Sequence, residues 1–351
     1  MSHAPTRTRK RATLKVVARA AGVSTATASK VLNHRPDVAA ETRERVEAAL
    51  REHGYERTTG PRDVTAVPVV TAVFDTLESI YSTQVLRGIL AAASEVDVDI
   101  VVEELSLAGG TLSARWISGV ARRHRLGVLV VTTALERSSA RVFQHEGLPV
   151  VAIDPPNIVP DSVVSVASSN FAGGSQAANH LLELGHRRIA LANGPSAHPT
   201  ARQRAHGYRS ALEAAGIVPE EELMLNGAFT YAAGVTMGDE LLGRATPPTA
   251  IFAASDLCAL GVLEAARRAG ARVPEDLSVV GYDDTPVAQW SAPPLTTVGQ
   301  NMRGLGQIAL RTLVQQAEGH LPVSHRIELA TSLVERDSTA APRGAAVEPV
   351  G

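Results

Sequence analysis

Cysteine is almost absent from this sequence of 351 residues, and aromatic residues make up only 3% of it. The single cysteine, Cys258, excludes a disulfide framework and any zinc site built on several cysteines. One cysteine in a chain of this length is also typical of a reducing compartment. We therefore do not expect a small, cross-linked secreted protein.

Long hydrophobic runs are missing as well. No stretch reaches the roughly 18 apolar residues that a membrane-spanning helix needs. The polar, arginine-rich start lacks the apolar core of a secretory signal. We expect a cytoplasmic protein with no membrane partner.

The common catalytic and cofactor motifs are absent too. The sequence contains no HExxH, no GxSxG and no P-loop. His186 and His206 have no partner at a metal-binding spacing. We therefore assign no catalytic residue, no metal site and no cofactor, and we predict that the chain is not an enzyme.

Charge is distributed unevenly along the chain. Residues 1–62 carry 13 Lys and Arg against 6 Asp and Glu, whereas the remaining residues carry 21 against 30. A small basic head followed by a larger acidic body is expected of a nucleic-acid-binding module joined to another domain. A solvated basic tail would give the same excess, so the pattern within the head has to decide.

The pattern within the head predicts three short helices. Apolar residues from Leu14 to Ala21 share one helical face, and Gly22 follows where a left-handed backbone ends a helix at little cost. Ser24 is placed to cap a second helix, and a third is expected from about residue 41 to 53. Three short helices around a small core are the architecture of a helix-turn-helix DNA reader.

Over residues 12–55 this head resembles the DNA-binding domain of the LacI/GalR family of transcriptional regulators, on the run ATLKVVARAAGVSTATASKVLNHRPDVAAETRERVEAALREHGY. The resemblance implies that the second helix lies in the major groove of double-stranded DNA. On its exposed face are Thr25, Ala26, Ser29 and Lys30, of which Thr25, Ala26 and Lys30 would read base edges, while Ser24, Thr27 and Asn33 would contact phosphates. Helix capping or solvation remains an alternative for each small polar residue.

The sequence departs from the family pattern at two places. Lys30 stands where arginine is common, which replaces a bidentate fork with a point charge. In the linker, residues 56–66, Gly60 and Pro61 would interrupt the hinge helix that the family usually has there, and Val64 is the only plausible minor-groove wedge. We predict that this linker folds poorly or differently and that DNA bending is weaker.

The body alternates short apolar runs with helical stretches. The runs are residues 67–75, 98–105, 126–133, 149–155, 188–194, 249–255 and 277–284. Continuous Val and Ile runs predict strands covered on both faces, hence parallel sheets of βαβ units. Several runs end in polar residues, namely Asp75, Asp154, Ser255 with Asp256, and Asp283 with Asp284. Ligands of open parallel sheets bind at that end of the strands.

The family resemblance extends through the body to about residue 339. It implies an effector-binding domain similar to periplasmic sugar-binding proteins. The fold class is therefore an all-α helix-turn-helix head followed by α/β, with two Rossmann-like parallel-sheet subdomains on either side of an effector cleft. The predicted segments are a disordered basic arm (1–11), the DNA-binding domain (12–55), the linker (56–66), an effector-binding and dimerisation domain (67–339) and a disordered tail (340–351). Within the effector domain, residues 67–168 and 301–325 form one subdomain, and residues 169–300 and 326–339 form the other.

Carried over position by position, the resemblance places these residues in the effector pocket: Arg204, Asp283, Ser255, Asp154, Phe229 and Gln300. Arg204 and Asp283 would bind hydroxyls through charge-assisted hydrogen bonds, and Phe229 would lie under a sugar ring. For Arg204 the alternative is a surface position, and for Asp283 it is a strand-end cap. Trp290 is expected either at the mouth of the cleft or in the core.

These residues together predict a homodimeric repressor of carbohydrate genes. Its partners would be an operator in the form of an imperfect palindrome and a mono- or oligosaccharide effector. Two alternatives remain open from the sequence. One is a regulator that responds to a purine or nucleoside, and the other is a sugar-modifying enzyme with a DNA-binding head.

Overall fold

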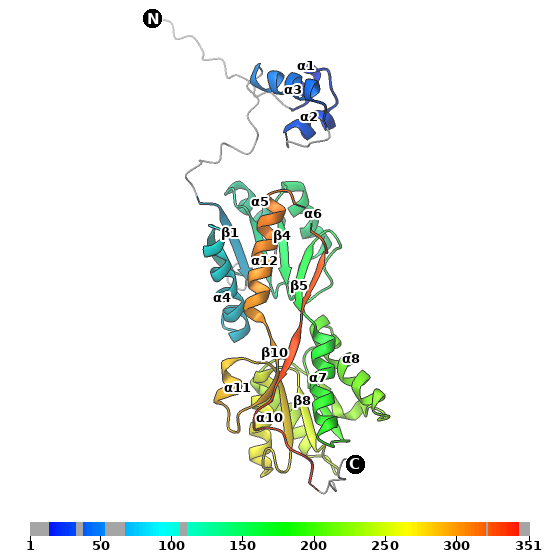
Figure 1. Ribbon diagram of the computed structural model, residues 1–351. Helices are drawn as coiled ribbons and strands as arrows, with labels where there is room; N and C mark the ends of the chain where they lie inside the picture. The colour runs from blue at the N-terminus through cyan, green and yellow to red at the C-terminus, as the bar shows by residue number, and fades with distance from the viewer. Residues whose placement is uncertain (1–13, 33–37, 53–66, 106–110, 321, 344–351) are drawn as a thin grey trace, which may run out of the picture. The chain divides into compact units, whose positions relative to one another are not determined.

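The computed structural model describes residues 14–32, 38–52, 67–105, 111–320 and 322–343 (Figure 1). The predicted arm 1–11, the linker 56–66, Asn33, Val64 and residues 344–351 lie outside the described residues. The chain divides into two compact units, Met1–Ala66 and Val67–Gly351.

The first unit contains three short helices, α1 (Leu14–Ala20), α2 (Thr25–Leu32) and α3 (Ala40–Glu52). Gly22, between α1 and α2, has a φ of 66°, the left-handed conformation that glycine adopts without strain. One small apolar cluster joins the helices and consists of Val17, Ala18, Ala21, Ala28, Val31, Val46 and Ala49. The predicted helix-turn-helix head is confirmed.

The second unit contains two six-stranded sheets. The first sheet has the strand order β11-β5-β4-β3-β1-β2, and all its neighbouring strands are parallel. Its strands are β1 (Val69–Phe74), β2 (Asp99–Glu104), β3 (Gly127–Val131), β4 (Val150–Ile153), β5 (Val164–Ser168) and β11 (Arg326–Leu329). Helices α4 (Ile80–Glu95) and α12 (Met302–Ala317) cover one face, and α5 (Ala114–Arg122) and α6 (Arg137–Glu146) cover the other.

The second sheet has the order β12-β10-β9-β8-β6-β7, and only β12 runs antiparallel to its neighbour. Its strands are β6 (Ile189–Asn193), β7 (Met224–Asn226), β8 (Ala250–Ala253), β9 (Ser278–Asp283), β10 (Thr296–Gln300) and β12 (Thr331–Val334). Helices α7 (Asn170–Glu183) and α8 (Pro199–Ala214) cover one face, and α9 (Tyr231–Leu242) and α10 (Asp256–Ala269) cover the other. The short helix α11 (Pro286–Trp290) follows β9. The predicted pair of parallel-sheet subdomains is confirmed.

The chain crosses between the two sheets three times, after β5, after β10 and after β11 (Figure 1). The first two crossings fall near residues 168 and 300, where the sequence places them. The third was predicted near residue 326, but β11 (Arg326–Leu329) still pairs with β5 in the first sheet. This crossing therefore occurs later, between Leu329 and Thr331.

Candidate functional site

A cavity of about 500 Å³ lies between the two sheets, at the carboxyl ends of their strands. Its lining includes side chains that follow β1, β4 and β8, namely Asp75, Asp154 and Ser255. The six residues that the sequence assigns to the pocket all line this cavity: Arg204, Asp283, Ser255, Asp154, Phe229 and Gln300. A cavity of this size is typical of small-molecule sites and has room for a ligand of more than one ring.

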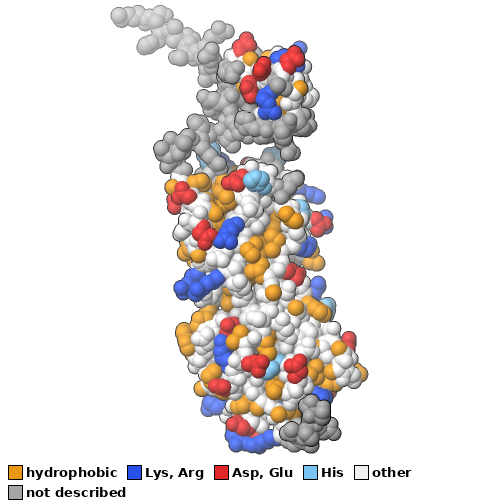
Figure 2. Space-filling model, viewed as in Figure 1, with side chains coloured by type: hydrophobic (Ala, Val, Ile, Leu, Met, Phe, Trp, Pro, Cys, Tyr) orange, Lys and Arg blue, Asp and Glu red, His pale blue; other side chains and the backbone are white. Residues whose placement is uncertain are grey.

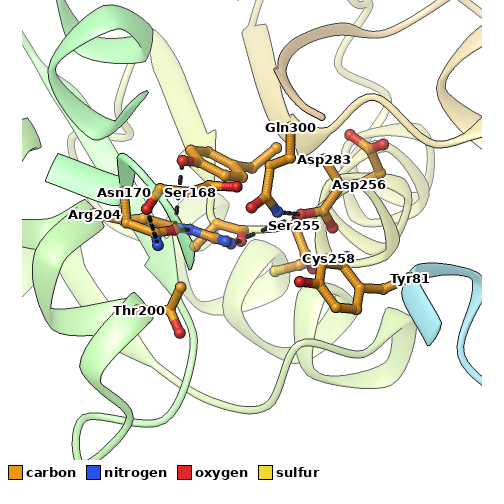
Figure 3. Close-up of polar contacts among 12 residues, drawn as sticks. Tyr81, Ser168, Asn170, Thr200, Arg204, Ser255, Asp256, Cys258, Asp283 and Gln300 are labelled. Atoms are coloured by element: carbon orange, nitrogen blue, oxygen red, sulfur yellow. Dashed lines mark hydrogen bonds and ion pairs between the residues drawn. The ribbon is translucent and has the colours of Figure 1, made fainter. Parts of the chain in front are cut away.

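Arg204 is buried at the cavity wall, with only 4% of its surface exposed. Its Nε donates to Oδ1 of Asn170 at 2.9 Å, and its Nη1 donates to the backbone carbonyl of Ala254. Nη1 also lies 3.9 Å from Oδ1 of Asp283 (Figure 3). These contacts hold the guanidinium in one orientation, so it is a fixed part of the wall rather than a surface arginine.

The close approach of α7 and α8 sets the position of Arg204. A Cβ on Gly174 of α7 would lie 2.2 Å from the backbone oxygen of Arg204. Only glycine at position 174 allows the two helices to pack at this distance. The backbone that carries Arg204 is therefore fixed by a contact outside the cavity.

Asp283 and Gln300 form a second polar group of the cavity. Nε2 of Gln300 donates to Oδ1 of Asp283 at 2.6 Å (Figure 3). Burial raises the pKa of Asp283 to about 7. The nearby Arg204 works against this rise, and Asp256 adds to it. Oε1 of Gln300 is buried and has no hydrogen-bond partner among the described residues. An acceptor left in this state is a position where a ligand hydrogen would fit.

Asp154 lies on the other side of the cavity and is bonded to Tyr81 of α4, whose hydroxyl donates to its Oδ2. Burial raises the pKa of Asp154, and the hydrogen bond from Tyr81 works against that rise. Burial, with Asp154 as the next cause, raises the pKa of Tyr81 well above 10. Tyr81 is a lining residue that the sequence analysis missed, because no motif marks a tyrosine in the first turn of a helix.

Three residues that line the cavity have a left-handed backbone although none is glycine. The φ angles are 48° at Thr132, 42° at Asp154 and 118° at Asp283. Such conformations cost about 1–3 kcal/mol each and persist where the surrounding structure holds them, often at ligand sites. All three occur directly at or after the ends of strands, so they concentrate strain at the cavity.

Phe229 provides the aromatic surface of the cavity. Its ring lies edge-on to His198, with the ring centroids 5.7 Å apart, and the Arg204 guanidinium carbon lies 5.5 Å from its centroid. A Cβ on Gly194 would lie 2.1 Å from Cζ of Phe229, so a glycine makes room for the ring. Burial lowers the pKa of His198, and Arg204 lowers it further, which favours the neutral imidazole.

Ser255 and Asp256 begin α10 at the cavity. Oγ of Ser255 accepts a hydrogen bond from the backbone nitrogen of Cys258 at 3.2 Å, so Ser255 caps the helix. Asp256 is fully buried and accepts from Thr285 and Thr297 of the neighbouring segments, at 2.6–2.8 Å. Burial raises the pKa of Asp256 to about 6. Asp256 thus ties the helix to the loops around it, while Ser255 faces the ligand space.

Trp290 does not line this cavity. It is 77% exposed and lines a separate groove together with Gln289 and Arg303. The expectation of a core position is therefore wrong. The groove also contains Gln300, which lines the cavity as well, so a position at the mouth of the cleft stays a prediction. The position of Trp290 at the end of the short helix α11, where the chain turns toward β10, leaves the ring outside both apolar layers.

In the head, the structure describes part of the predicted DNA-reading set. Ser24 caps α2: its Oγ accepts from the backbone nitrogen of Thr27 at 3.0 Å and lies 2.8 Å from the Thr27 hydroxyl. Ser24 and Thr25 are exposed. The capping alternative is thus realised for Ser24, which still has a second lone pair for a donor. The side chains of Ala26, Ser29 and Lys30 lie outside the described set.

Membrane-spanning helices and metal-binding clusters are both missing from the described residues. Among them, no helix combines the length and apolar character needed to cross a membrane. No group of three or more His, Cys, Asp or Glu side chains in the same part of the chain is arranged to hold a metal ion.

Two family models match the chain. Residues 13–58 match the lacI family of bacterial regulatory proteins, and residues 178–339 match a periplasmic binding protein-like domain. The two matches correspond to the helix-turn-helix head and to most of the second sheet with its helices.

Named relatives match over nearly the whole length. The HTH-type transcriptional regulator CelR of Thermobifida fusca is 38% identical over 94% of this chain and 99% of its own. The repressor CytR of Escherichia coli K12 is 32% identical over 94% of this chain and 97% of its own. PurR repressors, such as that of Erwinia tasmaniensis, show similar identity.

Solved structures of transcriptional regulators have a similar fold. The complex of CelR with cellobiose has a TM-score of 0.70 at 35% identity, covering 93% of this chain and 100% of that chain. The lac repressor dimer bound to operator and the anti-inducer ONPF has a TM-score of 0.70 at 30% identity, covering 95% of this chain and 100% of that one.

Proposed function

Because the chain belongs to the LacI family of DNA-binding transcriptional regulators, we propose that it represses carbohydrate genes and that a sugar in the cavity between its sheets changes its operator affinity. DNA binding places its site of action in the cytoplasm. The relatives named above are regulators, and we propose that this chain likewise has no enzymatic activity of its own.

The observation that supports a sugar effector is the composition of the cavity. A fixed guanidinium (Arg204), a carboxylate (Asp283) and an amide with an unused acceptor (Gln300) lie in the same cavity as the ring of Phe229. Polar groups that bind hydroxyls, together with an aromatic face for the apolar side of a ring, are the two requirements for recognising a polyol. Ser255 and Asp154 complete the set that we propose for effector binding.

Cellobiose is the first compound to test. The solved CelR complex contains it, and a cavity of about 500 Å³ has room for two sugar rings. A purine or nucleoside is the second candidate, because CytR and PurR repressors are relatives and the face of Phe229 would also stack on a base.

For DNA, we propose that two copies of the chain bind as a homodimer, as the lac repressor does in its operator complex. Two recognition helices related by a two-fold axis require half-sites about one helical turn apart, so the operator would be an imperfect palindrome. Within each head, Thr25, Ala26 and Lys30 would read bases, and Ser24, Thr27, Ser29 and Asn33 would lie close to the backbone. Val64 would be the wedge in the linker.

Two measurements on the purified full chain test this function. Selection of genomic fragments should yield a palindromic site that is bound at least about 1,000-fold more tightly than competitor DNA. A thermal-shift screen of sugars and nucleosides should then find a ligand that raises the melting temperature and changes the affinity for that site. Stabilisation by a nucleoside alone would replace the sugar with the second candidate, and no preference for any fragment would refute the function.

A further inference from the structure

We infer that the cavity excludes anions: it binds uncharged or cationic ligands that donate hydrogen bonds, and it rejects their phosphorylated counterparts. This inference rests on the proposed function only in taking the cavity as the effector site. It would hold for a sugar and for a nucleoside alike.

The charged groups that line the cavity are unbalanced. Four carboxylates belong to the lining, those of Asp75, Asp154, Asp256 and Asp283, whereas Arg204 is the one guanidinium in that described lining. The other basic group, His198, is shifted toward its neutral form by burial. On the face of the body drawn in Figure 2, acidic and basic side chains are interspersed.

Arg204 restores the balance toward a ligand only in part, because two of its five N–H donors are hydrogen-bonded and its Nη1 also faces Asp283. Nε is bonded to Asn170, and Nη1 is bonded to the carbonyl of Ala254 and faces Asp283. The guanidinium carbon also lies 3.6 Å from the ring centroid of Tyr282. A phosphate needs a bidentate fork or a ring of backbone N–H groups, and a guanidinium held in this way offers at most its Nη2 hydrogens.

Helix N-termini are the other usual anion sites, and those of α4, α8, α9, α10 and the five-residue α11 reach the cavity. Ser79 caps α4, accepting from Ser82, and Ser255 caps α10, which also carries the carboxylate of Asp256 in its first turn. Thr230 caps α9 in the same way, accepting from Ala233, whereas α8 and α11 begin with prolines, which have no N–H to donate. The positive ends of these helices are therefore largely compensated from within the chain.

Beside the Nη2 hydrogens of Arg204, the groups left open to a ligand include several acceptors. Oε1 of Gln300 is buried and has no partner among the described residues, in a residue only 8% exposed. The carboxylates of Asp283 and Asp154 accept one side-chain hydrogen bond each, from Gln300 and Tyr81, so each retains lone pairs. Hydroxyl and ammonium groups can satisfy these acceptors, whereas a phosphate dianion has no hydrogen to give. Burial is the main cause of the raised pKa of Asp283; Arg204 opposes the rise, and Asp256 and Asp154 add to it.

Matched pairs of ligands test the inference directly. We would titrate the full chain at pH 8 with cellobiose and cellobiose 6-phosphate, with adenosine and AMP, and with glucose and glucosamine. In any pair with a binding member, the phosphorylated compound should bind at least about 100-fold more weakly, which corresponds to about 2.7 kcal/mol. Glucosamine should bind no more weakly than glucose. A phosphorylated compound that binds as tightly as its neutral partner would overturn the inference, whichever pair shows it.

A pair of variants assigns the selectivity to the cavity. Asp75→Asn removes one negative charge from the exposed edge of the lining and should reduce the ratio between neutral and phosphorylated ligands severalfold. Asp99→Asn removes the same charge at the amino end of β2 and should leave the ratio unchanged. Equal effects of the two substitutions would attribute the selectivity to net charge instead and would contradict the inference.

If no member of any pair binds, the pH dependence of the protein's stability tests the inference without a ligand. Asp283 in the unfolded chain titrates near 3.8 and in the folded chain near 7, so folding is weakened as the pH rises between these values. The Asp283→Asn variant does not lose stability in this way, because it has no carboxyl at position 283 to titrate. The melting temperature of the variant minus that of the wild type should therefore increase between pH 5 and pH 8, by at least about 2 °C. A constant or decreasing difference would show that the pKa of Asp283 is not raised in the folded chain, which would contradict a cavity that disfavours negative charge and would overturn the inference.

Discussion

At the scale of single residues, the carboxyl of Asp283 determines how the effector affinity depends on pH. Its pKa is about 7 because the group is buried, and the protonated carboxyl is a weaker acceptor for ligand hydroxyls than the carboxylate. Binding should therefore release a proton below pH 7. We predict that the Kd of cellobiose, or of the sugar that the screen identifies, rises by up to about tenfold per pH unit as the pH falls from 7 to 5.5.

Calorimetry can check this proton linkage independently. At pH 7 the binding heat should differ between two buffers of different ionisation enthalpy, because the buffer takes up the released proton. Asp154, whose pKa is also raised, would add to the effect. A Kd that is constant from pH 5.5 to 8, with equal heats in both buffers, would contradict the role given to Asp283.

The resemblance to the family predicted six residues of the cavity, and for three of them the strand pattern indicates the same place. Asp154, Ser255 and Asp283 directly follow or end buried strands, and the carboxyl ends of parallel strands meet in space. Tyr81 and His198 were missed, because one lies in the first turn of α4 and the other in the loop before α8. No periodicity shows which side chain at a helix start faces a ligand.

At the scale of secondary-structure elements, the cap of α2 stabilises the head, the part of the chain that binds DNA. Ser24→Ala removes the hydrogen bond to the backbone nitrogen of Thr27 and should destabilise the head by about 1 kcal/mol. Ser24→Asn keeps a capping oxygen and should lose less stability than Ser24→Ala. Chemical denaturation followed by circular dichroism would measure the difference. Equal losses for the two variants would mean that the cap contributes nothing.

The packing of α7 against α8 is a second feature at the scale of secondary-structure elements. Gly174→Ala places a Cβ against the backbone of Arg204 and should cost about 2 kcal/mol or more while weakening effector binding, because α8 has to shift. Gly119→Ala in α5 meets nothing closer than 3.8 Å and should be neutral or stabilising. Thermal unfolding of both variants would show the contrast, and a Gly174→Ala protein with wild-type stability and affinity would contradict it.

The strands differ in how well the sequence predicts them. Seven were found from continuous Val and Ile runs, since strands covered by helices on both faces need apolar residues at every position. The strands β5 and β10 were not found, and neither were the edge strands β7, β11 and β12. These edge strands are three or four residues long, and β11 alternates exposed and half-buried side chains. Their pairing depends on the crossings between the sheets rather than on a local pattern.

At the scale of the whole molecule, the separation of a basic head from an acidic body should appear in the salt dependence of binding. Residues 1–62 carry a surplus of seven positive charges, and those near phosphates release counterions on binding. For a dimer on its operator we predict a steep linear fall of log K with log salt concentration. The effector should bind with almost no salt dependence, because its site is buried in the body. Similar slopes for operator and effector would contradict this division of roles.

The most direct test of the account is the operator affinity of the wild type and of Arg204→Ala over a titration with the effector. Arg204 belongs to the body and touches the cavity, whereas DNA is bound by the head. We predict that the wild-type affinity for the operator changes by about 5- to 150-fold as the effector saturates the cavity. Arg204→Ala should bind the operator as tightly as the unliganded wild type and should not respond to effector. Loss of operator binding together with the effector response, or an undiminished response, would contradict the central claim that a ligand between the sheets controls the DNA-binding head.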